Sequence, residues 1–298
     1  MTLLLNIDIL NLTRMSAVDL SYIARGNISG SFKKEVSDVL NDCYKRFGQR
    51  VPYKVEVYAF DTEENLHSFL REEKFKLGLS FSSIDEVSAC TYEVLKGFPR
   101  LLICQERLAP YSKLGRAGAL RHEAAHTVLH GSLEYSIFQI PEDCKHTAMV
   151  KGIQPEKLEE VFFQLSMGIK DFEATKFLVE HDFITCQFTY ALEWIKPMDD
   201  DRTAWTIARS NRQTRFVYES ALMRPLLFCD PLLSLQKSKK APEEEQIQLD
   251  ARIEQMIALL GETEENKVLK VAGSIIEVLG DDTHKNIDAA FHQLMNLI

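Results

Sequence analysis

The chain has 298 residues, 45% of them hydrophobic and 27% charged, the composition of an ordinary globular protein with enough residues for a sizeable core. Its formal net charge of −9 and its lack of a basic tract argue against nucleic acid as a partner. The early apolar run Leu3-Leu4-Leu5 lacks the flanks of a signal peptide, and no stretch approaches the roughly 20 apolar residues of a membrane span. We therefore expect a cytoplasmic protein with no membrane association, and the sequence leaves its oligomeric state unknown.

The first hundred residues favour mixed structure. Residues 31–47 carry apolar side chains at helical spacing, which predicts an amphipathic helix. Residues 53–60 alternate polar and apolar side chains, the period of a half-buried strand, and Asp61 or Thr62 can cap a helix that follows. Two further strands are predicted, around residues 86–94 and 100–105. Three strands flanked by helices predict an α+β domain.

A helix is predicted to begin near residues 114–116 and to stop at Gly131, directly after His130. Apolar residues occupy most of its sides, at Ala117, Leu120, Ala124, Ala125, Val128 and Leu129. A helix of this kind is buried, and polar side chains within it need partners.

Beyond residue 155 the periodicity is helical, and we expect a small mixed sheet packed on the 114–131 helix with a mainly helical C-terminal half. The acidic run Asp199-Asp200-Asp201 is expected to form a solvated turn. The polar stretch 236–243 is the best candidate for a linker. It would divide a domain of residues 1–236 from a C-terminal helical region of residues 237–298, packed as an appendage or lid. The predicted helices span residues 155–181, a segment ending at Trp194, and residues 243–260, 264–279 and 283–297.

The most informative stretch is His122-Glu123-Ala124-Ala125-His126, which has the His-Glu-x-x-His pattern of zinc peptidases. On a helix, the two histidines lie about 40° apart around the axis and about 6 Å apart along it, so both imidazoles can reach one metal ion. Glu123 is rotated by about 100° from His122, where its carboxylate can act as a general base on a water activated by zinc.

The sequence pattern His122-Glu123-x-x-His126-x-x-Leu129-His130 resembles that of the minimal zinc peptidases of the ImmA/IrrE type, which are gluzincin-like. That group carries an acidic metal ligand in a later helix, within the pattern Glu-x-x-Ala-Asn/Asp. The run 171–175, Asp-Phe-Glu-Ala-Thr, is similar to this pattern, with Asp171 in the ligand position. The resemblance covers roughly residues 97–185 and implies a zinc peptidase fold, with proteins as substrates or, in some members, as regulatory partners.

Two acidic residues compete for the role of third ligand. Asp171 and Glu173 are about 200° apart on a helix, so only one of them can face the metal. Glu173 shares its face with Lys170 and Lys176, the pattern of a solvated ion-pair face. Asp171 shares its face with small residues, among them Gly168 and Ala174, that would let this helix approach the histidine helix closely. We favour Asp171 and keep Glu173 as the alternative.

Other polar residues near the motif have plainer interpretations. His130 lies about 12 Å along the helix from His122, too far to join the same site easily, and is interpreted as a helix C-terminal residue favoured by the dipole. Tyr135 could stabilise an oxyanion or simply pack beneath the following loop. Three further residues are interpreted as surface residues, although a loop could bring them to a metal: Glu134, Glu142 and His146.

The six cysteines are widely spaced and form no Cys-x-x-Cys pair, which argues against a structural zinc cluster and a disulfide scaffold. We expect free and mostly buried thiols at positions 43, 90, 104, 144, 186 and 229.

The sequence thus predicts a zinc-dependent peptidase that holds one Zn²⁺ through His122, His126 and Asp171 and uses Glu123 as the general base. The 100–105 strand is the candidate edge strand for binding substrate backbone. The alternative is a regulatory protein, zinc-binding or metal-free, that uses a peptidase-like scaffold to bind a protein partner.

Overall fold

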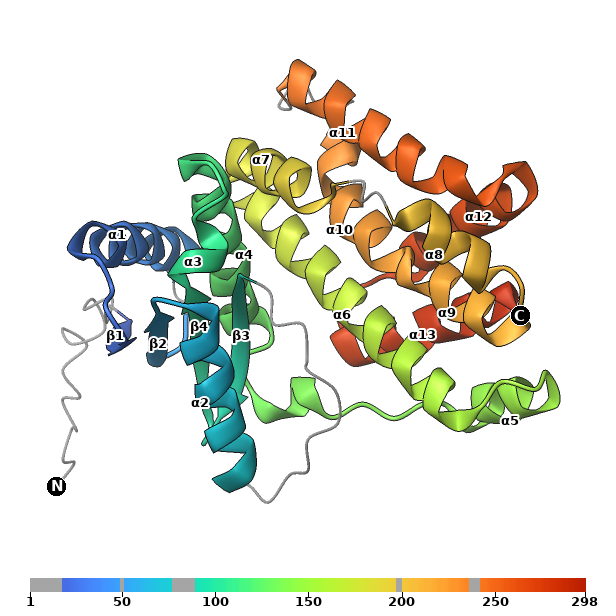
Figure 1. Cartoon of the computed structure of the whole chain (residues 1–298), viewed down its shortest axis with the longest axis horizontal. Helices are drawn as coiled ribbons and strands as arrows, with labels where there is room; N and C mark the ends of the chain where they lie inside the picture. Colours follow the sequence, from blue (N-terminus) through green and yellow to red (C-terminus); the bar gives the residue numbers. More distant parts are fainter. Residues whose placement is uncertain (1–17, 49–50, 77–88, 197–199, 236–241) are drawn as a thin grey trace, which may run out of the picture.

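A four-stranded mixed sheet lies at one side of the molecule and a large helical assembly at the other (Figure 1). This computed structural model describes residues 18–48, 51–76, 89–196, 200–235 and 242–298. The strand order is β1-β2-β4-β3; the first three of these run parallel, and β3 is antiparallel to β4. The strands are β1 (Asp19–Arg25), β2 (Lys54–Phe60), β3 (Cys90–Leu95) and β4 (Phe98–Cys104).

The strands predicted from the sequence are confirmed within the described residues, although residues 86–88 of the second one lie outside them. A fourth strand, β1, was missed. Its side chains are half-buried or exposed, so the sequence lacks the clear alternation of a strand with one buried face.

The prediction that the 100–105 strand lies at an edge of the sheet is wrong. This strand is β4, which pairs with β2 on one side and with β3 on the other. All of its residues after Phe98 are buried, as expected for a central strand covered on both faces. Among the residues that the structure describes, the edge strands of the sheet are β1 and β3.

Helices cover both faces of the sheet. On one face, apolar residues of α1 (Gly30–Phe47) and α4 (Lys113–Leu129) share a core with Val55, Val57 and Leu101. On the other face, α2 (Glu63–Lys76) packs Leu66 and Phe69 against the sheet. Local caps fix the start of the two larger helices: Ser29 accepts a hydrogen bond from the Phe32 amide, and Ser112 accepts one from the Gly115 amide. A short helix, α3 (Gln105–Leu108), follows β4.

The remaining chain is helical, as predicted, and the structure as a whole is α+β. Its central member is α6 (Pro155–Glu180), which packs against α4, α7, α9, α10 and α13. The other elements are η3 (Leu133–Ser136), α5 (Glu142–Val150), α7 (Ile184–Trp194), α8 (Asp201–Ala208), α9 (Arg212–Ala221), α10 (Met223–Leu233), α11 (Glu243–Ile257), η5 (Ala258–Leu260), α12 (Glu262–Val278), α13 (Thr283–Leu294) and η6 (Met295–Leu297).

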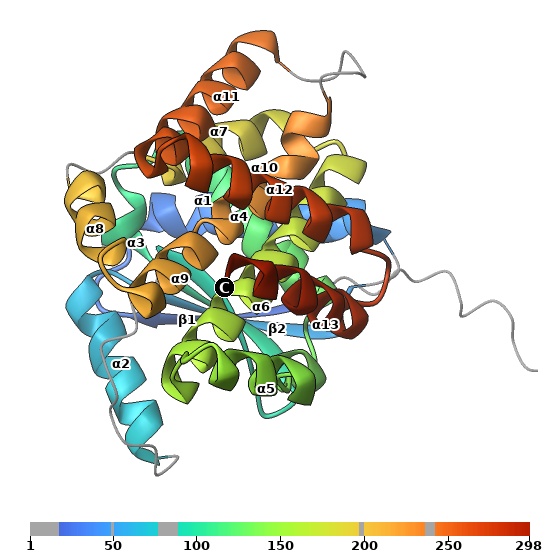
Figure 2. The ribbon, with the colours of Figure 1, turned by 90° about the vertical axis from the view of Figure 1, so that its right-hand side faces the viewer.

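The last three α-helices do not stand apart from the rest of the protein as an appendage. Leu249 of α11, Ile275 of α12 and Phe291 of α13 belong to the same hydrophobic core as Leu165 of α6 and Leu227 of α10. In Figure 2 these three helices lie over α7, α10 and α6. Most of the predicted linker, residues 236–241, and the apolar run near residue 3 lie outside the described residues.

Two further expectations concern the acidic run at residues 199–201 and membrane-crossing helices. Asp199 of the acidic run is not described, whereas Asp200 precedes α8 and Asp201 is its first residue. Among the described helices, none combines the length and the apolar composition that crossing a bilayer requires.

The contact between α4 and α7 depends on Gly118. A Cβ atom at this position would lie 2.3 Å from the Cys186 carbonyl oxygen and 2.6 Å from Tyr190 Cβ. Since both obstacles belong to the α7 backbone or its first side-chain atom, Gly118→Ala must push the two helices apart. We expect Gly118→Ala to lower the free energy of unfolding by about 1–3 kcal/mol in urea denaturation.

The matched control is Gly273→Ala in α12, where an added Cβ meets no atom within 4 Å. Because alanine restricts the unfolded chain and favours a helix, this variant should be neutral or more stable by up to about 1 kcal/mol. Equal effects of the two substitutions would contradict the close approach of α4 and α7.

Candidate metal centre

The His-Glu-x-x-His residues lie in the last three turns of α4, where that helix contacts β3, α6 and α7. His122, Glu123 and His126 are respectively 3%, 7% and 1% exposed. Three polar side chains are therefore almost completely removed from water, and each needs a compensating interaction. For the two histidines, the neighbouring helix α6 supplies it.

Asp171 of α6 completes a compact group of three donor atoms. Its Oδ1 atom lies 3.3 Å from His122 Nε2 and 3.2 Å from His126 Nε2, and the two Nε2 atoms are 3.1 Å apart. Ligands bound at 2.0–2.1 Å to one tetrahedral ion lie roughly 3.3 Å from one another. The three atoms are thus spaced as ligands of a common metal ion, so the residues present fit a zinc site.

Glu173, the alternative third ligand, points away from this group. Its carboxylate binds His130, Thr283 and Asn286, and its side chain is 15% exposed. The interpretation of its face as a solvated ion-pair face is therefore wrong. The periodicity placed Asp171 and Glu173 correctly on different sides of α6, but it could not reveal that α13 covers the Glu173 side.

The position of Asp171 depends on the packing of α6 against α10 rather than on the histidine helix alone. A Cβ atom on Gly168 would lie 3.1 Å from Arg224 Cα, so Gly168 lets α10, not α4, come close. As a consequence, Arg224 Nε donates a 2.6 Å hydrogen bond to Asp171 Oδ2. Burial alone would raise the pKa of Asp171, but Arg224 and the two histidines outweigh burial and hold that pKa well below its usual range.

Glu123 is turned toward the sheet. Its Oε2 atom accepts a 2.9 Å hydrogen bond from the backbone amide of Tyr92, in the edge strand β3. Burial, followed by the nearby negative charge of Asp171, raises the pKa of Glu123 to about 8. The Tyr92 ring stacks on His126, with ring centroids 4.5 Å apart and planes 9° from parallel. Thus β3 holds both the carboxylate and one imidazole of the motif.

His130 lies at the C-terminal end of α4, as the sequence suggested, but its surroundings do not favour the cation that a helix dipole would stabilise. It is the C-cap of α4, but it is fully buried. Its Nδ1 atom lies 3.0 Å from His126 Nδ1, and its Nε2 atom lies 2.8 Å from Glu173 Oε2. Burial lowers its pKa, which favours the neutral ring over the cation that a helix dipole would stabilise.

The loop candidates lie elsewhere. Glu134, Glu142 and His146 are exposed, as expected, and the structure does not bring them to the group of three donor atoms. Tyr135 is half-buried and packs edge-on against His130, with ring centroids 5.4 Å apart. The six cysteines are buried thiols, as predicted.

A second group of potential ligands lies where α5 meets α13: Asp143, Cys144 and His292. The side chains of Asp143 and His292 are 71% and 39% exposed, and they form an ion pair of 3.0 Å. Burial raises the pKa of the Cys144 thiol to about 11, which disfavours the thiolate that binds metal. This group is better described as a surface ion pair above a buried thiol.

Sequence reasoning missed several residues that shape the centre. Tyr92 and Arg224 come from elements far along the chain from the motif, and no local pattern marks them. Lys170 was assigned to the solvent, yet it is 7% exposed, and burial lowers its pKa to about 8. Asn286 is buried and therefore needs polar partners, but its burial is known only from the structure.

Comparisons of this chain with family models, with curated proteins and with solved structures gave no match.

The ion pair between Arg224 and Asp171 offers a direct test of the arrangement. Arg224→Met leaves the Asp171 carboxylate buried without its guanidinium, so the metal-free protein should lose about 3 kcal/mol of unfolding free energy. In an Asp171→Asn background the same substitution should cost less than about 1 kcal/mol, because the charge that needs neutralising is gone.

The surface substitution Lys34→Met serves as the control. It removes an exposed i,i+4 pair with Asp38, so it should change stability by no more than about 0.5 kcal/mol. An Arg224→Met effect of the same size with and without the Asp171 charge would show that the two residues are not coupled.

Proposed function

We propose that this protein is a zinc-dependent peptidase in which His122, His126 and Asp171 hold the metal and Glu123 is the general base. The observation that carries the proposal is the convergence of three buried donor atoms, 3.1–3.3 Å from one another. Two of them belong to α4, the helix that also bears Glu123. Two imidazoles and one carboxylate are a donor set that Zn²⁺ favours and that leaves a fourth position open.

Bound zinc would supply an activated water and would polarise a peptide carbonyl. The chain itself would supply the proton transfers. The Glu123 carboxylate would take a proton from the attacking water and pass it to the departing amine.

The position of β3 supports a peptide as the substrate. β3 is an edge strand, and the amide of Tyr92 in it points to Glu123 rather than to β4. An extended peptide that pairs with the outer edge of β3 would run beside the proposed base. The resemblance of the motif to the ImmA/IrrE-type peptidases agrees with this reading.

One observation favours a second candidate, a regulatory protein that binds a partner without cleaving it. All four proposed site residues are less than 9% exposed, and Glu123 is already hydrogen-bonded to the protein's own strand. A scaffold that only holds zinc needs no path for substrate. A base next to the metal, by contrast, has a use only if the site opens.

The first test concerns the metal. The purified protein should bind about one zinc ion per chain, because one group of converging donor atoms is present in the centre. His122→Ala, His126→Ala and Asp171→Ala should each weaken zinc binding at least about tenfold, as measured by competition with a coloured chelator. His146→Ala, at an exposed histidine, is the control and should bind zinc like the wild type. Undiminished zinc affinity in both motif-histidine variants would rule out the site.

The second test separates the enzyme from the binding protein. Glu123→Gln removes the base while keeping the shape of the side chain, so zinc should still bind and peptide hydrolysis should fall by at least about a hundredfold. Cleavage of an unstructured peptide library is followed by mass spectrometry, with and without a chelator. The exposed Glu142→Gln should cleave like the wild type. Equal cleavage by the Glu123→Gln variant would exclude Glu123 as the base.

A further inference from the structure

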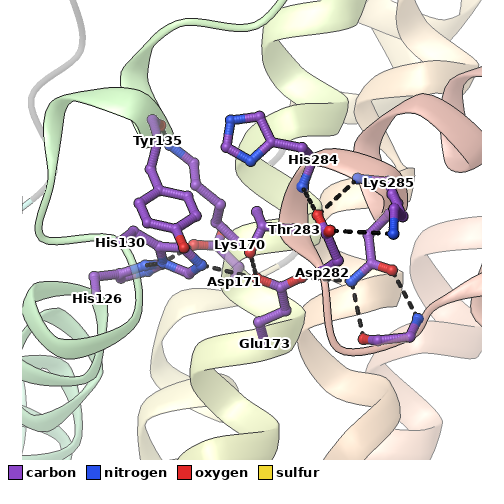
Figure 3. Close-up of polar contacts among 12 residues, drawn as sticks. His126, His130, Tyr135, Lys170, Asp171, Glu173, Asp282, Thr283, His284 and Lys285 are labelled. Carbon is purple, nitrogen blue, oxygen red and sulfur yellow. Dashed lines mark hydrogen bonds and ion pairs between the residues drawn. The ribbon is translucent and has the colours of Figure 1, made fainter. Parts of the chain in front are cut away.

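The centre contains a line of hydrogen bonds that continues beyond the proposed ligands. His126 Nδ1 lies 3.0 Å from His130 Nδ1, and His130 Nε2 lies 2.8 Å from Glu173 Oε2 (Figure 3). These three residues come from the end of α4 and the middle of α6. None of the contacts is needed to bring the donor atoms together, so the line calls for a separate explanation.

The far end of this line is anchored by α13. The Gly280 amide can only donate, and it donates a 2.7 Å hydrogen bond to Asn286 Oδ1. The Asn286 side chain must therefore present its NH₂ group to Glu173, which accepts at Oε1 over 2.7 Å. Thr283 donates to the other oxygen of Glu173, Oε2, over 2.8 Å. Both oxygens of Glu173 thus accept a hydrogen bond from α13.

The direction of each remaining hydrogen bond follows from this anchor and from the proposed zinc ion. Both oxygens of Glu173 accept from α13, so His130 donates to Glu173 from Nε2. Zinc bound at His126 Nε2 requires the His126 proton to lie on Nδ1, and the atom that faces this proton, His130 Nδ1, must then accept. A neutral His126 with its proton on Nδ1 has its lone pair on Nε2, the atom that lies 3.2 Å from Asp171 Oδ1.

We propose that Glu173 and His130 are positioning residues that fix the tautomer and the orientation of His126, so that its Nε2 lone pair faces the metal. The inference rests on the proposed zinc site and gives α13 a part in it. His122 has no such support, since its Nδ1 atom is buried without a hydrogen-bond partner among the described residues. The two histidines of the motif are thus held in different ways, and only His126 is held by a carboxylate acting through a second imidazole.

Glu173→Gln tests the direction of the line with a minimal change of shape. Because Asn286 presents its NH₂ group, the new amide must turn its oxygen toward Asn286 and its own NH₂ toward His130. His130 would then accept at Nε2 and donate from Nδ1, which moves the His126 proton onto Nε2. We expect zinc affinity to fall about 10- to 100-fold, the range seen when such supporting contacts are lost.

The matched control is Glu159→Gln, at an exposed position on the same helix, which should bind zinc like the wild type. Circular dichroism and thermal unfolding of the metal-free variants show whether each has folded. If the wild type binds no zinc, the proposed function fails and the positioning role fails with it. If the wild type binds zinc through His126 and Glu173→Gln binds it equally well, only the positioning role is overturned.

A second measurement needs no substitution. In wild-type protein labelled with ¹⁵N-histidine and loaded with zinc, nuclear magnetic resonance distinguishes protonated from unprotonated ring nitrogens. We expect His130 to be neutral with its proton on Nε2, and His126 to carry its proton on Nδ1. A proton on His130 Nδ1, in either a neutral or a charged ring, would overturn the proposed direction.

Discussion

The centre of this protein is organised by the burial of one negative charge. Asp171 is 2% exposed, and it contacts His122, His126 and Arg224 within 3.3 Å. A carboxylate removed from water in this way is stable only if positive or polar groups converge on it. That requirement brings together α4, α6 and α10, and the glycine at position 168 allows the last two helices to come close enough.

The sheet and the helical assembly contribute different things to the centre. β3 supplies the backbone amide that holds Glu123 and the ring that packs on His126, so it fixes the side chains of the motif from one side. The helical assembly supplies charges and hydrogen-bond partners: Arg224 for Asp171, and Thr283 and Asn286 for Glu173. Since these groups are spread from residue 92 to residue 286, the centre exists only in the folded chain.

The sequence predicted what is local and periodic. The helical pattern around residues 114–131 and 155–181 placed the histidine motif and Asp171 on buried helices, and helix geometry separated Asp171 from Glu173. Prediction from the sequence failed where a residue's surroundings depend on a contact that is distant in the chain. The apolar run at residues 100–105 predicts a strand but not the strands that pair with it. A glutamate beside two lysines is typical of a solvated helix face, and only the structure shows that another helix covers Glu173. The contact of His130 with Glu173 was likewise not foreseen, because it joins two helices.

The hydrogen bond between Glu123 and Tyr92 also bears on how the sheet avoids self-association. The unpaired edge of a strand is a template for another strand, and proteins guard such edges by covering them or by directing a charge toward them. Here α4 contacts β3, and the Glu123 carboxylate accepts a hydrogen bond from one amide of that strand. The proposed base therefore also guards the edge. A movement that frees Glu123 from this hydrogen bond therefore leaves one amide of β3 available to a neighbouring strand.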